Sequence, residues 1–142
     1  MIKKLPRCLF VFLSLAMVTA CNNREFNLPP GDVEAGRATF VLLQCNECHA
    51  VKGVPYMGSD HHEIKVSLGG KTTRVKSYAD LVTSIINPSH RLSREGVNNT
   101  TTDDGQSRMQ NYNEFMTVEE LTNLVTFLES RYEIWVPTTY DY

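Results

Sequence analysis

The chain has no apolar run long enough to cross a membrane, and its cysteines are few enough to be considered one by one. It holds four cysteines among 142 residues, and charged residues of both signs make up 21% of it. This charge balance excludes an acidic disordered chain and a basic nucleic-acid-binding chain. The length suits one modest globular domain with a single core.

The first twenty residues differ from the rest and have the parts of an export signal. Lys3, Lys4 and Arg7 precede an apolar run over residues 9–18 that only a serine interrupts. The run is shorter than the roughly 18 to 20 residues that a transmembrane helix needs, and it matches the apolar core of a secretory signal. Residues 1–20 are therefore predicted to be a signal peptide.

The end of this signal, Val18-Thr-Ala-Cys21, resembles the lipobox of bacterial lipoproteins, in which the cysteine is acylated and becomes the first residue. The resemblance implies a lipid anchor at Cys21 and a place on the periplasmic side of a bacterial membrane. The alternative is an ordinary signal peptide with a free Cys21. Asn22 stands where aspartate commonly retains lipoproteins at the inner membrane, so the choice between inner and outer membrane stays open. Residues 21–30 are predicted to be a short tether.

Removal of the signal would leave an acidic protein. It takes away three basic residues and no acidic one, so 11 basic residues stand against 16 acidic ones and the net charge is near minus 5. This balance argues against a nucleic-acid partner.

Two cysteines are left for the folded domain, because Cys8 is lost with the signal and Cys21 is assigned to the lipid. Cys45 and Cys48 form a Cys-x-x-Cys pair. A structural zinc site needs four protein ligands, and neither a second such pair nor suitably spaced histidines are present. A thioredoxin-like dithiol would follow a strand, whereas the residues upstream of Cys45 have a helical pattern.

The residue after this pair points to a different chemistry. Cys45-Asn-Glu-Cys48-His49 has the C-x-x-C-H pattern of c-type haem attachment. Two thiols separated by two residues can each form a thioether with one haem vinyl group, and the next side chain then lies under the iron. The pattern predicts one haem c held covalently by Cys45 and Cys48, with His49 as the proximal ligand. Export agrees with this, because the attachment takes place outside the cytoplasm.

The other side of the iron needs a second ligand, and six side chains could supply it: Met57, Met109, Met116, His61, His62 and His90. Residues 117–120, Thr-Val-Glu-Glu, form a capping box that starts a helix, and Met116 is placed to pack on Leu121 as a hydrophobic staple. Met116 thus has a structural role. Met109 lies in a polar segment without a helical role, and Met57 follows the haem motif too closely to cross easily to the opposite haem face.

Residues 109–121, Met-Gln-Asn-Tyr-Asn-Glu-Phe-Met-Thr-Val-Glu-Glu-Leu, resemble the closing signature of class I cytochromes c. In that family an axial methionine, usually followed by proline, precedes an aromatic residue and the opening of the last helix. In this chain Gln110 replaces the usual proline and Met116 replaces the usual leucine. The resemblance implies that Met109 is the second axial ligand.

A stretch near the start of the folded domain, residues 32–40, resembles the first helix of these cytochromes. Asp32 is a suitable helix cap, and Gly36 precedes Phe40 by four residues. The family packs this helix across the last one. The resemblance therefore implies that Gly36 lets Phe127 approach closely.

Two more helices follow from apolar spacing. Residues 77–86 carry apolar side chains at helical spacing, Ser77 is a suitable cap, and Pro88 ends the helix because it disfavours helical geometry in the preceding residue. This segment also resembles bacterial monohaem cytochromes. The helix that begins after Thr117 carries its apolar side chains on one face: Leu121, Leu124, Val125, Phe127 and Leu128.

The chain departs from the family after the haem motif. Many class I cytochromes have a Gly-Pro there, whose backbone carbonyl accepts the proximal imidazole hydrogen. No Gly-Pro occurs in this chain, where Val54 precedes Pro55. The acceptor of the His49 hydrogen is therefore left unassigned, although such contacts tune the iron.

Together these features predict an all-α fold, a small cytochrome c fold with three main helices packed around one covalent haem. The domain is expected over residues 31–133, with a C-terminal tail over residues 134–142. The resemblance implies a one-electron carrier between periplasmic or membrane redox proteins, and not an enzyme. The alternative is a cytochrome c subunit bound tightly to a dehydrogenase or terminal oxidase complex. A haem enzyme or gas sensor ranks third, because the chain has a single haem motif near its N-terminus.

Overall fold

The computed structural model describes residues 28–58, 64–74, 76–92 and 100–136. The elements in chain order are α2 (Val33–Leu42), the short 3-10 helix η2 (Cys45–Glu47), β1 (His49–Val51), β2 (Val66–Leu68), β3 (Gly70–Thr72), α3 (Tyr78–Ile86), α4 (Val118–Glu129) and β4 (Tyr132–Ile134). Cys21, His61 and His62 lie outside the described residues. Within the described ranges, no helix is both long enough and apolar enough to cross a membrane.

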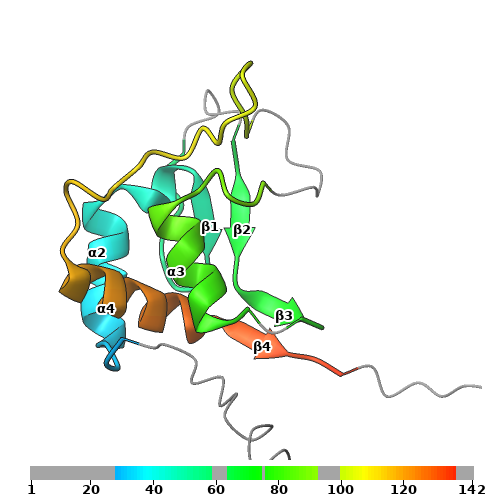
Figure 1. The fold of residues 1–142 in the computed structure, drawn as a ribbon. Coiled ribbons are helices and arrows are strands. Elements are labelled where there is room, and N and C mark those ends of the chain that lie inside the picture. Colours follow the sequence, from blue (N-terminus) through cyan, green and yellow to red (C-terminus); the bar gives the residue numbers. More distant parts are fainter. Residues whose placement is uncertain (1–27, 59–63, 75, 93–99, 137–142) are drawn as a thin grey trace, which may run out of the picture.

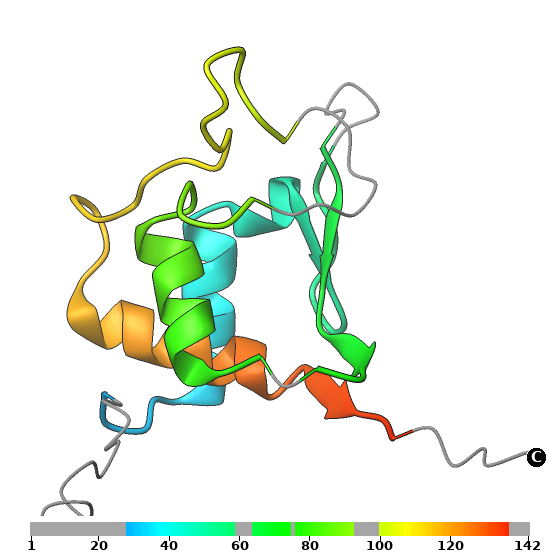
Figure 2. The ribbon, with the colours of Figure 1, turned by 45° about the vertical axis from the view of Figure 1, so that its right-hand side comes forward.

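The helices gather on one side of the molecule and the short strands on the other (Figure 1). Helices α2 and α4 cross each other, α3 lies beside them, and the β1–β2 pair stands across from α3. The turned view in Figure 2 shows the same arrangement, with residues 100–117 running over one end of the helices.

The start of α2 is tied to α4 as well as capped. Asp32 accepts a hydrogen bond of 2.6 Å from the backbone N–H of Ala35, so the predicted cap and helix are confirmed. The backbone N–H of Gly31 donates to Thr126 Oγ1 (3.0 Å), and that of Asp32 donates to Asn123 Oδ1 (2.7 Å). These bonds fix where α2 begins on the surface of α4.

Gly36 is buried where α2 crosses α4. A Cβ atom at this position would lie 2.0 Å from the Asn123 carbonyl oxygen and 2.7 Å from Phe127 Cβ. The ring of Phe127 packs against Phe40, with 5.8 Å between the ring centroids, and both side chains are buried. The predicted close approach of Gly36 and Phe127 is therefore confirmed.

The other two helices begin and end as the sequence indicates. Thr117 and Glu120 form the predicted capping box of α4. Ser77 caps α3, which ends at Ile86, two residues before Pro88. The predicted apolar face of α4 is buried: Leu121, Leu124, Val125, Phe127 and Leu128. Because burying one such side chain contributes about 1.5–3 kcal/mol, this face is a principal source of stability for the core.

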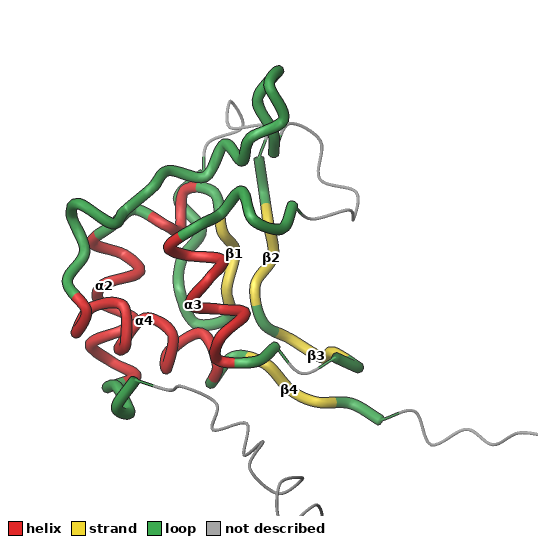
Figure 3. The backbone as a smooth tube through the Cα atoms, in the orientation of Figure 1, coloured by secondary structure: helices red, strands yellow, loops and turns green. Residues whose placement is uncertain are grey.

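The all-α fold class is wrong, because the fold is mixed α/β. Two separate parallel sheets of two strands each accompany the helices, β1 paired with β2 and β3 with β4 (Figure 3). In these pairs His49 lies opposite Val66, and Gly70 lies opposite Tyr132. Strands of three residues are too short to show an alternating pattern, and parallel partners are distant in sequence. The sequence pattern therefore carried no signal for them.

Two glycines make the turn from β2 into β3. Gly69 and Gly70 have φ values of 83° and 84°, a left-handed geometry that glycine adopts readily. The backbone N–H of Gly70 donates to the Arg131 carbonyl (2.8 Å), which brings β3 against the residue before β4. Strand β4 includes Ile134, the first residue of the segment that the sequence assigns to the tail.

The capping box of α4 should make the free energy of unfolding fall in acid. Hydrogen bonds from the backbone and side chain of Thr117 lower the pKa of Glu120 below its ordinary value of 4.5. At a pH between the folded-state and unfolded-state pKa of Glu120, the unfolded chain binds more protons than the folded one. The stabilisation that Glu120 gives to the fold is therefore fully present above pH 4.5, and it is lost as the pH falls through the lower folded-state pKa. Urea unfolding between about pH 6 and pH 3 should therefore show a smaller fall for Glu120→Gln than for the parent. Equal falls would contradict this.

Candidate functional site

An apolar cavity lies between the helices and the β1–β2 pair. It has about 560 Å³ of empty space, part of it open to solvent. Its apolar walls include residues from α2, α3 and α4: Phe40, Leu81, Ile85, Leu124 and Leu128. Its walls also hold side chains that can bind iron or a porphyrin: Cys45, His49, Met109 and Met116.

The two cysteines follow directly after α2. Gln44 has a φ of 58°, a left-handed geometry that separates α2 from η2. Both thiols are free, and Cys45 lines the cavity whereas Cys48 does not. Burial raises the pKa of the Cys45 thiol to about 11. A redox dithiol has a lowered thiol pKa and follows a strand, so this setting opposes the thioredoxin-like alternative.

Buried Asn46 ties the haem motif to the loop that follows β1. Its Nδ2 donates to the Pro55 carbonyl (3.0 Å), and the backbone N–H of Met57 donates to the Asn46 carbonyl (2.9 Å). The loop therefore folds back over the motif. The Pro55 carbonyl receives the hydrogen of Asn46, so it is engaged in a contact other than the one that the family pattern would give it with His49.

His49 is the first residue of β1, and its partner in β2 is Val66. The backbone N–H of Val66 donates to the Cys48 carbonyl (2.9 Å), which fixes β2 against the motif. His49 Nδ1 is buried without a hydrogen-bond partner. Burial lowers the pKa of His49, and the Val66 backbone opposes this shift. A buried ring nitrogen without a partner needs an explanation, and the neutral imidazole that burial favours is the form that binds a metal.

Two methionines line the cavity from the segment before α4. The backbone N–H of Met109 donates to Ser107 Oγ (3.1 Å), and that of Ser107 donates to Ser89 Oγ (3.0 Å), which ties the segment to the residues after α3. Met116 is partly buried and packs against the hydrophobic core, in agreement with the staple prediction. Met109 also lines the cavity but is not among the residues of that core cluster, so it lacks this packing role.

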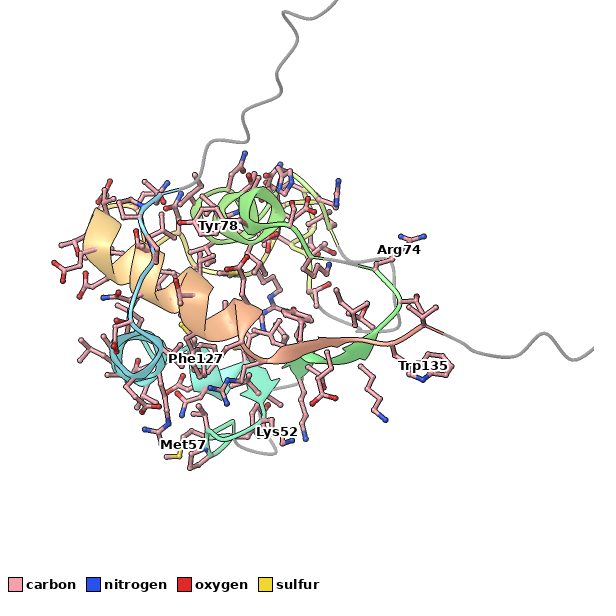
Figure 4. The ribbon with its side chains drawn as sticks, turned by 90° about the horizontal axis from the view of Figure 1, so that it is seen from below. Lys52, Met57, Arg74, Tyr78, Phe127 and Trp135 are labelled. Atoms are coloured by element: carbon pink, nitrogen blue, oxygen red, sulfur yellow. The ribbon has the colours of Figure 1, made fainter. Side chains whose placement is uncertain are left out.

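The other described side chains that could bind iron lie away from the cavity. Met57 is 65% exposed, and Figure 4 shows it at the periphery, on the far side of Phe127 from α3. His90 is exposed, and its Nδ1 lies 3.1 Å from the Asn87 carbonyl. Neither residue lines the cavity. The structure therefore reduces the described candidates for the second ligand to Met109 and Met116.

Sequence reasoning assigned no role to Tyr112, which the structure places in the cavity wall. Its hydroxyl donates to the Leu43 carbonyl (3.1 Å), across 69 residues of chain. Burial raises the pKa of Tyr112, and the neighbouring Cys45 and Cys48 add to the rise. The aromatic position in the closing signature was a signal for this residue, but its distant partner could not be found from local pattern.

No family model, curated protein or solved structure matches this chain. Within the described ranges, no group of three or more His, Cys, Asp or Glu side chains is placed to hold a metal ion. The function of the cavity therefore has to be argued from its own residues. Three of the predicted haem-binding residues, Cys45, His49 and Met109, line it together, whereas the predicted lipid site at Cys21 lies outside the described residues.

Proposed function

We propose that this protein is a monohaem c-type cytochrome that carries single electrons. The observation that supports this most is the meeting of a thiol, an imidazole and a thioether in one apolar cavity. Cys45, His49 and Met109 reach it from three different segments: the short helix η2, strand β1 and the loop before α4. The C-x-x-C-H pattern accounts for the first two.

The residues present fit haem c. Cys45 and Cys48, both free, would hold the porphyrin as thioethers, and His49 and Met109 would be its axial ligands. The apolar walls would exclude water from the iron. Bound haem would supply a one-electron couple, and a methionine ligand would raise its potential.

The backbone of β2 would supply the contact that a Gly-Pro provides in the family. Val66 is the strand partner of His49, and its backbone raises the His49 pKa, as a carbonyl does that accepts an imidazole hydrogen. We expect the Val66 carbonyl to orient the ring when Nε2 binds iron. Such a contact holds the ligand ring and increases its basicity.

The two methionines in the wall favour a carrier over a haem enzyme or gas sensor. Either of those functions needs an open position on the iron, whereas a thioether beside the cavity can close it. The alternative of a cytochrome c subunit keeps the same site and adds a permanent partner. Co-purification with a stoichiometric dehydrogenase or oxidase would distinguish the subunit from the free carrier.

The location and the partners belong to this proposal and rest on sequence. A lipid anchor at Cys21 would hold the protein on the periplasmic side of a bacterial membrane. Its electron donor and acceptor would be other redox proteins, which bind a carrier through small, transient interfaces.

Covalent attachment of haem is the test of the proposal. The full chain, exported by a host with the haem c maturation machinery, should be red, and acidified acetone should leave the colour on the polypeptide. Its mass should rise by one haem. The double variant Cys45→Ala with Cys48→Ala should lose all colour on the same extraction, because no thioether can form. A colourless exported parent would refute the proposal.

A further inference from the structure

We propose that Tyr112 is a positioning residue, whose hydroxyl ties the Met109 segment to the haem-attachment motif and so keeps Met109 in place as a ligand. The inference rests on the proposed function. The hydroxyl donates to the Leu43 carbonyl at 3.1 Å. Leu43 is the C-cap of α2 and lies two residues before Cys45. The bond therefore ends on the segment that presents the first thiol.

The backbone of Tyr112 belongs to the segment that carries both methionines. Its carbonyl accepts hydrogen bonds from the backbone N–H groups of Phe115 (3.0 Å) and Met116 (2.9 Å), which form the turn into α4. Met109 lies three residues earlier, and Met109 and Tyr112 both line the cavity. Tyr112 thus has its backbone in the ligand segment, and its hydroxyl binds the residue that leads into the motif.

Two other hydrogen bonds from the same segment lead to α3 and the residues after it. Ser107 binds Ser89, in the residues after α3, and Asn113 Nδ2 donates to the Ile86 carbonyl at 2.9 Å. These bonds do not reach the haem motif. In the structure the Tyr112 hydroxyl reaches Leu43 while Met109 and Tyr112 both line the cavity. Its loss should therefore penalise the state with Met109 on the iron and leave the detached state unchanged.

The experiment compares Tyr112→Phe with Asn113→Ala, a matched control that removes one hydrogen bond from the same segment. The oxidised holoprotein is titrated to alkaline pH while the weak red charge-transfer band of methionine ligation is followed. For Tyr112→Phe the equilibrium constant for detachment should rise about five-fold, the factor of one neutral hydrogen bond, so the midpoint of a one-proton transition falls by about 0.7 pH unit. For Asn113→Ala the midpoint should stay at the parent value. Thermal unfolding of all three proteins reports the structural cost separately.

Each result decides the matter. A lower midpoint in Tyr112→Phe alone supports the positioning role, even where both variants lose thermal stability equally. An unchanged midpoint in Tyr112→Phe, or equal falls in both variants, overturns it while leaving the proposed function intact. A parent protein that holds haem but lacks the band removes the methionine ligand itself, and the inference with it.

Discussion

Replacing Met109 with alanine should abolish the weak red charge-transfer band of the oxidised holoprotein and lower its reduction potential. Met109 lines the cavity from a loop and is not part of the core cluster, so its loss should remove a ligand without collapsing the fold. A methionine ligand favours ferrous iron. Axial ligands set haem potentials over a range of about 0.8 V, and a fall of roughly 0.1 to 0.2 V is expected here. Absorption spectra and a redox titration measure both effects.

The matched control is Met116→Ala, because Met116 also lines the cavity. This side chain packs against the core, so the variant should lose stability, by about 2 kcal/mol, and keep the red band. Met57→Ala should keep both the stability of the parent and the red band, since Met57 is largely exposed. If the band survives in Met109→Ala and vanishes in Met116→Ala, the axial ligand is Met116 and the assignment from the family resemblance is wrong.

The Met109→Ala variant also distinguishes an electron carrier from a gas sensor. The reduced parent should take up carbon monoxide poorly, because Met109 competes for the iron, whereas reduced Met109→Ala should take it up readily. Rapid uptake by the parent would indicate an open position. It would then favour the haem enzyme or sensor alternative over electron transfer.

The helices of this fold could be predicted because their signals are local. Thr117 and Glu120 lie within one turn of each other, and Pro88 stops α3 through the geometry of its neighbour. The buried face of α4 follows from spacing alone. The crossing of α2 over α4 is not local, and it was predicted from family resemblance through Gly36 and Phe127.

The parts that escaped prediction depend on contacts between distant segments. Strand β3 pairs with β4 through Gly70 and Tyr132, which are far apart in sequence. Strand β1 pairs with β2 through His49 and Val66, and the side chain of Val66 gives no hint of this pairing. Three-residue strands of this kind form because the core brings their backbones together, and no intrinsic preference announces them.

The candidate site also combines residues that local sequence could identify with contacts that only the fold reveals. Covalent haem chemistry requires Cys45, Cys48 and His49 at fixed spacing, so sequence could name them. Sequence named Met109 and Met116 among the candidate ligands, but it treated the structural role of Met116 as a reason to set that residue aside. The structure places Met116 against the core and in the cavity wall at once. The hydrogen bond from Tyr112 to Leu43 could be identified only from the structure, because the two residues are 69 positions apart in the chain.

The crossing of α2 and α4 should be the most sensitive point of the fold. Gly36→Ala should lower the free energy of unfolding by roughly 2 to 3 kcal/mol, although alanine favours a helix by about 1 kcal/mol over glycine. The new Cβ would lie 2.0 Å from the Asn123 carbonyl oxygen, a backbone atom of α4 that cannot rotate away. The helices would have to separate. Separation would open the packing of Phe40 on Phe127.

Ala38→Gly is the matched control, because Ala38 lies in the same helix and is exposed. That variant loses a Cβ and should cost about 1 kcal/mol through helix propensity alone. Removing a Cβ at one position and adding one at the other should thus both destabilise α2, for different reasons, and urea unfolding would measure the two effects. Gly36→Ala should also lower the yield of haem-loaded protein, because α2 leads directly into Cys45. A Gly36→Ala protein as stable as the parent would show that the two helices do not approach as closely as the structure places them.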